Sequence, residues 1–258
     1  MTENFHTHTY RCHHATGTDR EYIEKAIELG YKKLGFSDHL PQLYPGGFAR
    51  SDRMALADIP EYFDTLTKLK AEYKKEIEIY IGFESEYQQG VTEPTLEHLK
   101  QFPLDYLILG QHFSTADSSE HYFSQTEDAG QLKQYVNEVI AAIKTGKFTF
   151  IAHPDVFNYA PDDDIYYTEM KRLCVAAKKA NVPLECNMLG TGGFGNRRRN
   201  YPCDKFFKIA GEVGNEVLIS CDAHQPEMLD NKEGYDICLN MLKKYGITPL
   251  TNIKLIKP

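Results

Sequence analysis

Short apolar runs alternate with amphipathic segments along the whole chain, and this alternation restricts the fold more than any other feature. Strands rich in Ile, Leu, Val and Phe are predicted at residues 4–9, 33–38, 78–84, 106–111, 148–153, 182–187 and 216–221. Most lack strict polar–apolar alternation, which is typical of strands covered on both faces. Strands separated by helices imply crossover connections and therefore a parallel sheet.

Helical patterns fill the intervals between these strands. Thr18 and Glu21 have the spacing of a capping box, before a helix that ends near Gly30. We expect the same cap at Asp58 and Glu61. Further apolar stripes predict helices around residues 93–100, 132–143, 170–177, 206–213 and 237–242.

Seven strand–helix units fit either a barrel or an open doubly wound sheet. The chain has no GxGxxG fingerprint and no P-loop, which weakens the nucleotide-binding form of the open sheet. No linker or low-complexity stretch divides it, and 258 residues is an ordinary length for one α/β barrel. The sequence therefore predicts a single domain over residues 1–258.

Composition excludes several classes of protein. The net charge of −8 argues against a protein that binds the nucleic-acid backbone, because neutralising phosphates requires a basic surface. No run of about 18 apolar residues predicts a membrane span, and the first residues do not resemble a secretory signal. The six cysteines are scattered without CxxC spacing, so we expect a reducing, cytoplasmic setting. Self-association is left open.

Polar side chains stand at the end of every predicted strand. Because the carboxyl ends of parallel barrel strands form one face, these groups are expected to meet there. The strand ends, in chain order, are His6-Thr7-His8, Asp38-His39, Glu84-Ser85-Glu86, Gln111-His112, His153-Pro154-Asp155, Glu185-Cys186-Asn187 and Asp222-Ala223-His224.

The type and spacing of these residues predict a metal site. His6 and His8 lie two apart on a strand, so they project from one face at a separation of about 6.5 Å. Asp222 and His224 have the same spacing. Imidazole and carboxylate ligands suit Zn, Mn or Fe. The donors exceed the needs of one metal, and paired metals suit phosphoryl transfer because they hold the phosphate and activate water.

These residues resemble the polymerase-and-histidinol-phosphatase (PHP) superfamily. Its pattern is HxH after the first strand, a histidine shortly after, DH, a glutamate, two separate histidines and a closing DxH. The positions that match, over the whole chain and in order, are His6, His8, His14, His39, Glu84, His112, His153, Asp222 and His224.

Within that superfamily the chain resembles the monofunctional histidinol-phosphatase branch. The supporting segments are HTHTYRCHHATGT, GFSDH, GFESEY, GQHF, AHPD, LECN, RNYP and CDAH. Two positions depart from the usual pattern: His13 replaces a proline and Cys221 replaces a serine. His13 competes with His14 as a ligand, and spacing favours His14. Cys221 is expected to be a small buried hydrophobe rather than a catalytic thiol.

The resemblance implies a distorted (β/α)7 TIM-like barrel with two to three divalent ions (Zn, Mn or Fe) at the carboxyl ends of its strands. One ion would be held by His6, His8, Glu84 and Asp222. Glu84 would bridge to a second ion, held also by His112 and His153. A third would be held by His14, His39 and His224.

The implied activity is hydrolysis of L-histidinol phosphate to L-histidinol and phosphate by a metal-activated hydroxide, a step of histidine biosynthesis. The alternative is a PHP-type phosphoesterase acting on another small phosphate ester or on a nucleotide. We expect small-molecule phosphate esters as partners, and neither nucleic acid nor membrane.

Roles are also predicted around the metal site. We expect catalytic contributions from Glu84, Asp222 and His224. A metal-bound water or Asp155 would supply the proton to the leaving group. Candidates for substrate binding are Arg197 and Arg199 for the phosphate and Asn187 or Glu185 for the amine or imidazole. Glu86 and Asp38 are expected to orient ligands.

Overall fold

A computed structural model describes residues 1–258 except 115–121, 126, 158 and 197. The described strands are all parallel and form two hydrogen-bonded sheets, ordered β1-β2-β3-β4 and β5-β6. Their bounds are β1 Glu3–Asn4, β2 Lys33–His39, β3 Glu78–Ser85, β4 Tyr106–Leu109, β5 Leu184–Asn187 and β6 Val217–Ser220.

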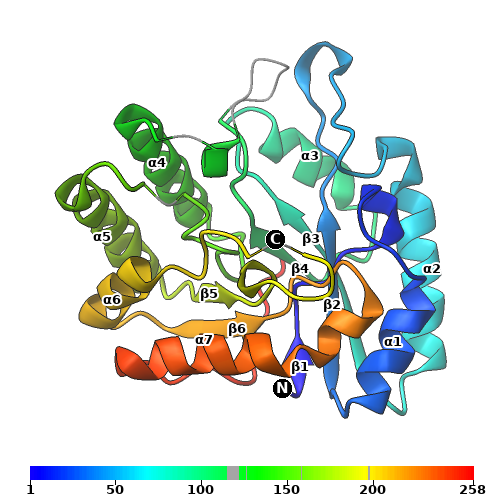
Figure 1. The fold of residues 1–258 in the computed structure, drawn as a ribbon. Coiled ribbons are helices and arrows are strands. Elements are labelled where there is room, and N and C mark those ends of the chain that lie inside the picture. The colour runs from blue at the N-terminus through cyan, green and yellow to red at the C-terminus, as the bar shows by residue number, and fades with distance from the viewer. Residues whose placement is uncertain (115–121, 126, 158, 197) are drawn as a thin grey trace.

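Helices surround these strands on the outside (Figure 1). In the described residues, one α-helix lies between each strand and the next along the chain, with residues 148–153 counted as a strand segment, and one more follows the last strand. They are α1 Asp19–Glu28, α2 Ile59–Glu72, α3 Thr92–Leu99, α4 Ala129–Thr145, α5 Asp163–Ala180, α6 Asp204–Val213 and α7 Lys232–Lys244. Short 3₁₀ turns occur at Tyr10–Cys12, Pro45–Gly47, Leu56–Asp58, Phe123–Gln125, Leu189–Thr191 and Pro226–Asp230. No helix in the described ranges is long and apolar enough to cross a membrane.

Single bridges connect the two sheets into one curled parallel sheet. Ile151 bridges Leu109 of β4 on one side and Leu184 of β5 on the other. At the opposite edge, Thr7 bridges Ala223, just beyond β6. The observed fold is therefore an α/β fold with a curled parallel sheet, consistent with a distorted TIM-like barrel.

Two of the predicted strands, residues 4–9 and 148–153, are much shorter than the sequence suggested, whereas β4, β5 and β6 are each two residues shorter than predicted. Residues 4–9 form strand only at β1, because the Ser37 hydroxyl accepts the Thr7 amide hydrogen at 3.3 Å, where a longer strand would use a backbone carbonyl. Residues 148–153 make only bridges at Ile151. Pro183, directly before the neighbouring strand β5, has no amide hydrogen to donate to this segment. His153 ends the segment with a φ of 28°.

The helix predictions are confirmed in place, and one cap is wrong. The Thr18–Glu21 capping box is present at the start of α1, and Gly146 ends α4 in the left-handed conformation. Asp58 makes no side-chain cap to α2. Its carboxylate instead accepts the Ala55 amide hydrogen at 3.1 Å, because a 3₁₀ turn precedes the helix.

Two apolar cores hold this arrangement together. The larger lies between the strands and the outer helices. The smaller lies inside the curled sheet and consists of Phe5, Tyr106, Ile108, Phe150, Ala152 and Leu218. The Tyr106 ring fills the interior so closely that a Cβ at Gly35 or Gly82 would lie within 2.5 Å of its atoms. The interior is thus a packed core rather than a channel.

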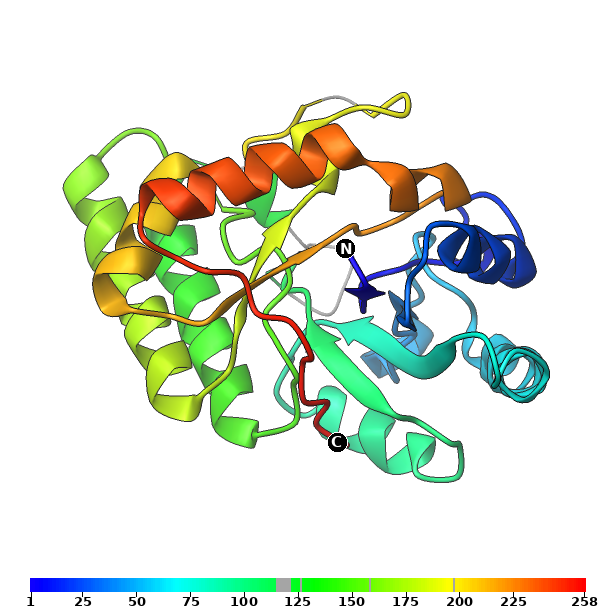
Figure 2. The same ribbon diagram turned by 90° about the horizontal axis from the view of Figure 1, so that it is seen from below.

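The C-terminal segment closes the amino end of the strands. It runs across them beneath the sheet (Figure 2). The amide of Leu250 donates to the Val217 carbonyl at 2.7 Å, and the amide of Ile256 donates to the Thr149 hydroxyl at 3.1 Å. Because this end is covered, access to the sheet interior is left to the opposite face, where the strands end in polar residues.

Candidate functional site

A cavity of about 570 Å³ opens at the carboxyl ends of the strands. Eight of the nine predicted metal ligands line it, and the ninth, His6, is fully buried beside them. The cavity is lined by His8, Cys12, His13, His14, His39, Ser51, Asp52, Glu84, His112, Phe113, Tyr122, His153, Leu189, Asn196, Arg199, Tyr201, Asp222 and His224. The sequence-predicted cluster is therefore one site in space.

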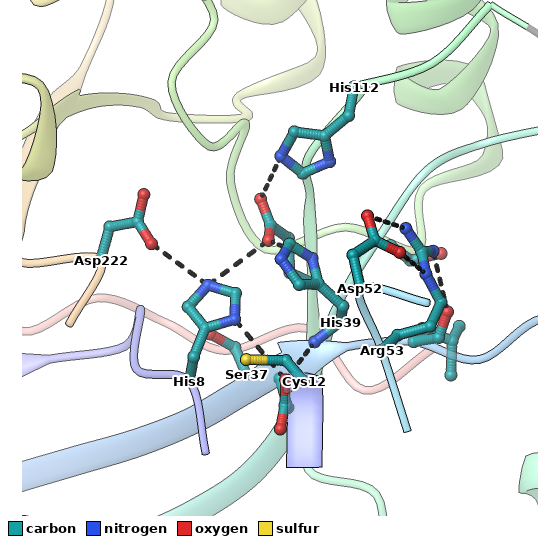
Figure 3. A network of polar contacts seen from close by, with 12 residues as sticks. His8, Cys12, Ser37, His39, Asp52, Arg53, His112 and Asp222 are labelled. Carbon is teal, nitrogen blue, oxygen red and sulfur yellow. Dashed lines mark hydrogen bonds and ion pairs between the residues drawn. The ribbon is translucent and has the colours of Figure 1, made fainter. Parts of the chain in front are cut away.

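Glu84 lies at the centre of this cluster. Figure 3 shows His8, His39 and His112 converging from different elements, with Asp222 beside His8. Imidazole nitrogens face both oxygens of the Glu84 carboxylate. The distances are 2.9 Å to His153 Nε2, 3.4 Å to His112 Nε2, 3.7 Å to His6 Nε2, 3.0 Å to His39 Nδ1 and 3.6 Å to His8 Nε2. A Cβ at Gly110, directly after β4, would lie 1.9 Å from Glu84 Oε1, so the position of this carboxylate requires glycine there.

Asp222 forms a second focus. Its Oδ1 lies 3.1 Å from His8 Nε2, 3.4 Å from His6 Nε2 and 3.5 Å from His224 Nδ1. The Asn187 amide holds the other oxygen at 3.1 Å. Asp222 has a φ of 50°, in the left-handed region that non-glycine residues rarely adopt.

Several of these buried atoms have no hydrogen-bond partner among the described residues. They include His6 Nε2, both ring nitrogens of His8, Glu84 Oε2 and Asp222 Oδ1. Buried polar atoms are almost always paired, because an unpaired one costs about 1–3 kcal/mol. Nitrogen and oxygen donors that face one another unpaired are what a divalent ion between them would satisfy. The residue set therefore fits metal ions.

The donor atoms fall into overlapping groups small enough to share ions. Such sets, with all atoms within 4.8 Å, include His6–His8–Asp222, His6–Glu84–His153, His8–His39–His224 and Cys12–His14–His224. The His14 ring lies 4.9 Å from His224 and 5.4 Å from His39. His13 lies at the cavity wall and caps the first 3₁₀ turn with a φ of 67°.

A second layer of carboxylates orients the histidines. Glu185 Oε1 accepts a hydrogen bond from His6 Nδ1 at 2.7 Å, which turns the Nε2 lone pair toward the cluster. Glu86 Oε1 lies 3.1 Å from His112 Nδ1, and Asp38 Oδ1 lies 3.6 Å from His8 Nδ1. Asp38 and Glu86 thus lie where the sequence predicted residues that orient ligands.

The cluster perturbs the protonation of its own members. Burial opposes ionisation of Glu84, but charge on His112, His6 and His39 outweighs it and holds the pKa of Glu84 well below its usual range. Burial also opposes charge on His6, and there Asp222 and Glu185 outweigh it and raise the pKa of His6 well above its ordinary value. Burial and the nearby charge of His8 lower the pKa of His39 to about 4. Protons and metal ions therefore compete for the same atoms.

The predicted substrate-binding residues differ in their position relative to the cavity. Arg199 lines the cavity, with its guanidinium 5.9 Å from the Tyr201 ring centre. Arg197 lies outside the described residues. Asn187 is fully buried and does not line the cavity. Its amide donates to Glu185 and Asp222, so it positions these carboxylates, and the prediction that it contacts substrate is not supported.

Asp155 also lies away from the cavity wall. It is fully buried, and its Oδ2 accepts the Cys203 amide hydrogen at 2.5 Å. Burial raises its pKa to about 7. The predicted role as proton donor to a leaving group requires contact with the cavity, so we assign Asp155 to anchoring the segment that carries Tyr201.

Sequence reasoning missed several residues of the cavity wall. Tyr122 stacks on His112 with ring centres 6.0 Å apart, and Tyr201 lies 5.6 Å from His153. Cys12 is buried beside His14 and His224. Asp52 comes from the long connection between β2 and α2. Cys12 ends a 3₁₀ turn and the other three lie in loops, where no periodicity marks which side chains point inward.

The model of the PHP domain family matches residues 4–189. The chain belongs to the PHP domain family. A probable histidinol-phosphatase of Deinococcus radiodurans is 30% identical over 86% of this chain and 85% of its own length. The histidinol-phosphatase of Bacillus subtilis is 29% identical over 54% of this chain and 58% of its own.

Two solved structures share the fold. A histidinol phosphate phosphatase of Lactococcus lactis, solved with zinc, L-histidinol and phosphate, superposes with a TM-score of 0.73 at 18% identity and covers 99% of both chains. A Listeria monocytogenes structure whose protein is described as a putative histidinol phosphatase gives a TM-score of 0.71 at 20% identity, over 90% of this chain and 99% of that one. The PHP resemblance predicted from the sequence is confirmed.

Proposed function

We propose that this protein is a metal-dependent histidinol-phosphatase that hydrolyses L-histidinol phosphate to L-histidinol and phosphate. The observation that carries the proposal is the cluster of buried imidazole and carboxylate groups around Glu84, several of whose atoms have no hydrogen-bond partner among the described residues. Family membership and the histidinol-phosphatases among its relatives support the substrate. The Lactococcus lactis protein with the same fold was solved with L-histidinol and phosphate.

We further propose a single domain built as a seven-unit barrel. Residues 148–153 would bring the number of strands to seven, because their backbone is hydrogen-bonded to both β4 and β5. Leu109 N donates to Phe150 O, and Glu185 N donates to Ile151 O. The amides of His8 and Ala223 join the first and last segments in the same way. The ring of backbone bonds supports this count.

Two to three divalent ions of Zn, Mn or Fe would be held by nine residues: His6, His8, His14, His39, Glu84, His112, His153, Asp222 and His224. When bound, such ions supply positive charge that lowers the pKa of water to about 7 and stabilises phosphoryl charge. The groups of ligand atoms that lie within 4.8 Å of one another overlap at His6, His8 and His224, which supports more than one ion.

The protein's own side chains have separable tasks in this reaction. Arg199 reaches the cavity and would donate hydrogen bonds to the phosphate oxygens, for which a guanidinium is well shaped. Glu185 and Asn187 keep His6 and Asp222 in place beneath. Tyr122, Tyr201 and Phe113 wall the cavity and limit the water that reaches the ester.

Two conservative variants test the proposal. Glu84→Gln and Asp222→Asn keep the size of the side chain and remove a charge that the ions require. We expect each to lower kcat/KM for L-histidinol phosphate at least 100-fold and to reduce the bound metal, measured by elemental analysis. Near-normal turnover with unchanged metal content in both variants would contradict the assignment. If the wild-type protein hydrolysed a different phosphate ester or a nucleotide instead of L-histidinol phosphate, the same site would be assigned to the alternative function.

A further inference from the structure

The cavity extends beyond the histidine cluster to the connection between β2 and α2. Asp52 lies on this connection and lines the cavity, with 34% of its side chain exposed. Figure 3 shows Asp52 and Arg53 next to His39, at the edge of the cluster. Glu84 and Asp222 are the other carboxylates among the described lining residues, and both face imidazoles within the cluster. Asp52 is thus the described wall carboxylate that remains accessible to a ligand.

Arg53 holds Asp52 in a fixed orientation. Arg53 Nε donates to Asp52 Oδ1 at 3.0 Å, and Nη2 donates to Oδ2 at 3.3 Å. The same guanidinium, which is buried, also donates to Glu86 at 2.9 Å. Arg53 therefore shares its positive charge between Asp52 and Glu86, so Asp52 keeps negative charge that a ligand cation can complement. Fixing the carboxylate in advance also reduces the entropy lost on binding.

Arg199 and Asp52 approach the cluster from different sides. Arg199 stands over Tyr201, whose ring is 5.6 Å from His153. Asp52 stands beside His39. His112 lies between these two histidines, 4.9 Å from His153 and 5.3 Å from His39 by ring centres. The cavity wall therefore carries Arg199 on one side of the cluster and the carboxylate of Asp52 on the other.

We propose that Asp52 is a specificity-determining residue that binds the protonated amine of a phosphate monoester whose phosphate lies over the histidine cluster. The inference rests on the proposed function, because it names the group by which that site selects its substrate. A zwitterionic ester places an anion and a cation a few bonds apart, which matches a cavity with Arg199 on one side and Asp52 on the other. A neutral or purely anionic ester of the same size has nothing to pair with Asp52 and leaves the carboxylate to be partly desolvated without compensation.

The test compares esters that differ only in the amine. kcat/KM is measured for L-histidinol phosphate and its deamino analogue, and for 2-aminoethyl phosphate and ethyl phosphate. The proteins are wild type, Asp52→Asn, Asp52→Glu and the control Asp64→Asn, which removes the same charge from an exposed position on α2. Metal content is measured for every variant.

We expect wild type to prefer the amine-bearing member of each pair by about 10- to 100-fold, the range of a hydrogen bond between charged groups. Asp52→Asn should reduce this preference to less than threefold by raising KM for the amine-bearing ester, with little change for the amine-free ester. Asp52→Glu should restore part of the preference, and Asp64→Asn should keep all of it.

Three results would overturn the inference. They are a wild type with no amine preference, an Asp52→Asn variant that keeps the preference, and an Asp52→Asn variant that loses both esters equally along with metal. The last would show that Asp52 acts only through Arg53 and Glu86. Failure of the proposed function is visible separately, as poor turnover of L-histidinol phosphate by wild type, and the aminoethyl and ethyl pair still decides the role of Asp52.

Discussion

Replacing Glu185 by glutamine should disturb the histidine cluster without replacing any predicted metal ligand. Four donors converge on this buried carboxylate. His6 Nδ1 and the Ser220 hydroxyl reach Oε1 at 2.7 Å, and the His153 amide and Asn187 Nδ2 reach Oε2 at 2.8 Å. Glutamine offers one oxygen and one NH₂ group, so two of the four donors would lose their acceptor.

The expected magnitude follows from this count. A buried donor left without an acceptor costs about 1–3 kcal/mol, so Glu185→Gln should lower the free energy of unfolding by about 2–6 kcal/mol. Partners that orient metal-binding histidines typically contribute 10- to 100-fold to metal affinity or activity. Because His6 and His153 both depend on Glu185, we expect losses of that size in metal affinity and in kcat/KM.

The assay is competition for metal against a chromophoric chelator, with kcat/KM and urea unfolding measured on the same preparations. Glu216→Gln is the matched control, since Glu216 is exposed and lies just before β6. A Glu185→Gln protein that binds metal within threefold of wild type and keeps its kcat/KM would refute the orienting role. Loss of stability with full metal affinity would limit Glu185 to a structural role.

Three further predictions follow from the site. Asp155→Asn should keep kcat/KM within threefold, and in urea unfolding it should be more stable than wild type at pH 8 but not at pH 4. The raised pKa of Asp155 stabilises the fold below about pH 4 and this contribution, about 4 kcal/mol at most, is lost as pH rises through about 7. Arg199→Ala should raise KM at least 10-fold, whereas Arg198→Ala, an exposed neighbour, should not. Metal removal should lower Tm more at pH 8 than at pH 6, because the raised pKa of His6 stabilises the metal-free fold only while the ring is protonated; equal shifts in calorimetry at both pH values would contradict this.

The sequence predicts this fold well where one period dominates a segment. The stripe over residues 132–143 and its stop at Gly146 correspond to α4, and the apolar run at 78–84 corresponds to β3. It fails where side chains compete with the backbone for hydrogen bonds. Ser37 breaks the ladder beside Thr7, and Asp58 caps a 3₁₀ turn rather than α2. Apolar periodicity carries no information about either of these side-chain hydrogen bonds.

The site shows the same division. Strand ends predict which residues meet, because parallel strands share a face, so the histidines near Glu84 were found from their positions alone. Orientation within a strand end is a different matter. Asn187 and Glu185 lie two apart on β5, and both turn toward the cluster beneath the cavity instead of into it. Asp52 and Tyr122 reach the wall from loops whose course depends on tertiary packing.

Phosphate release from L-histidinol phosphate, with manganese-reconstituted protein and a chelator-treated control, tests the central claim most directly. The account predicts a kcat/KM above about 10⁴ M⁻¹s⁻¹ that disappears with the chelator and returns when metal is restored. Negligible turnover by fully metallated protein would contradict the proposed substrate. Turnover that survives complete metal removal would contradict the metal site itself.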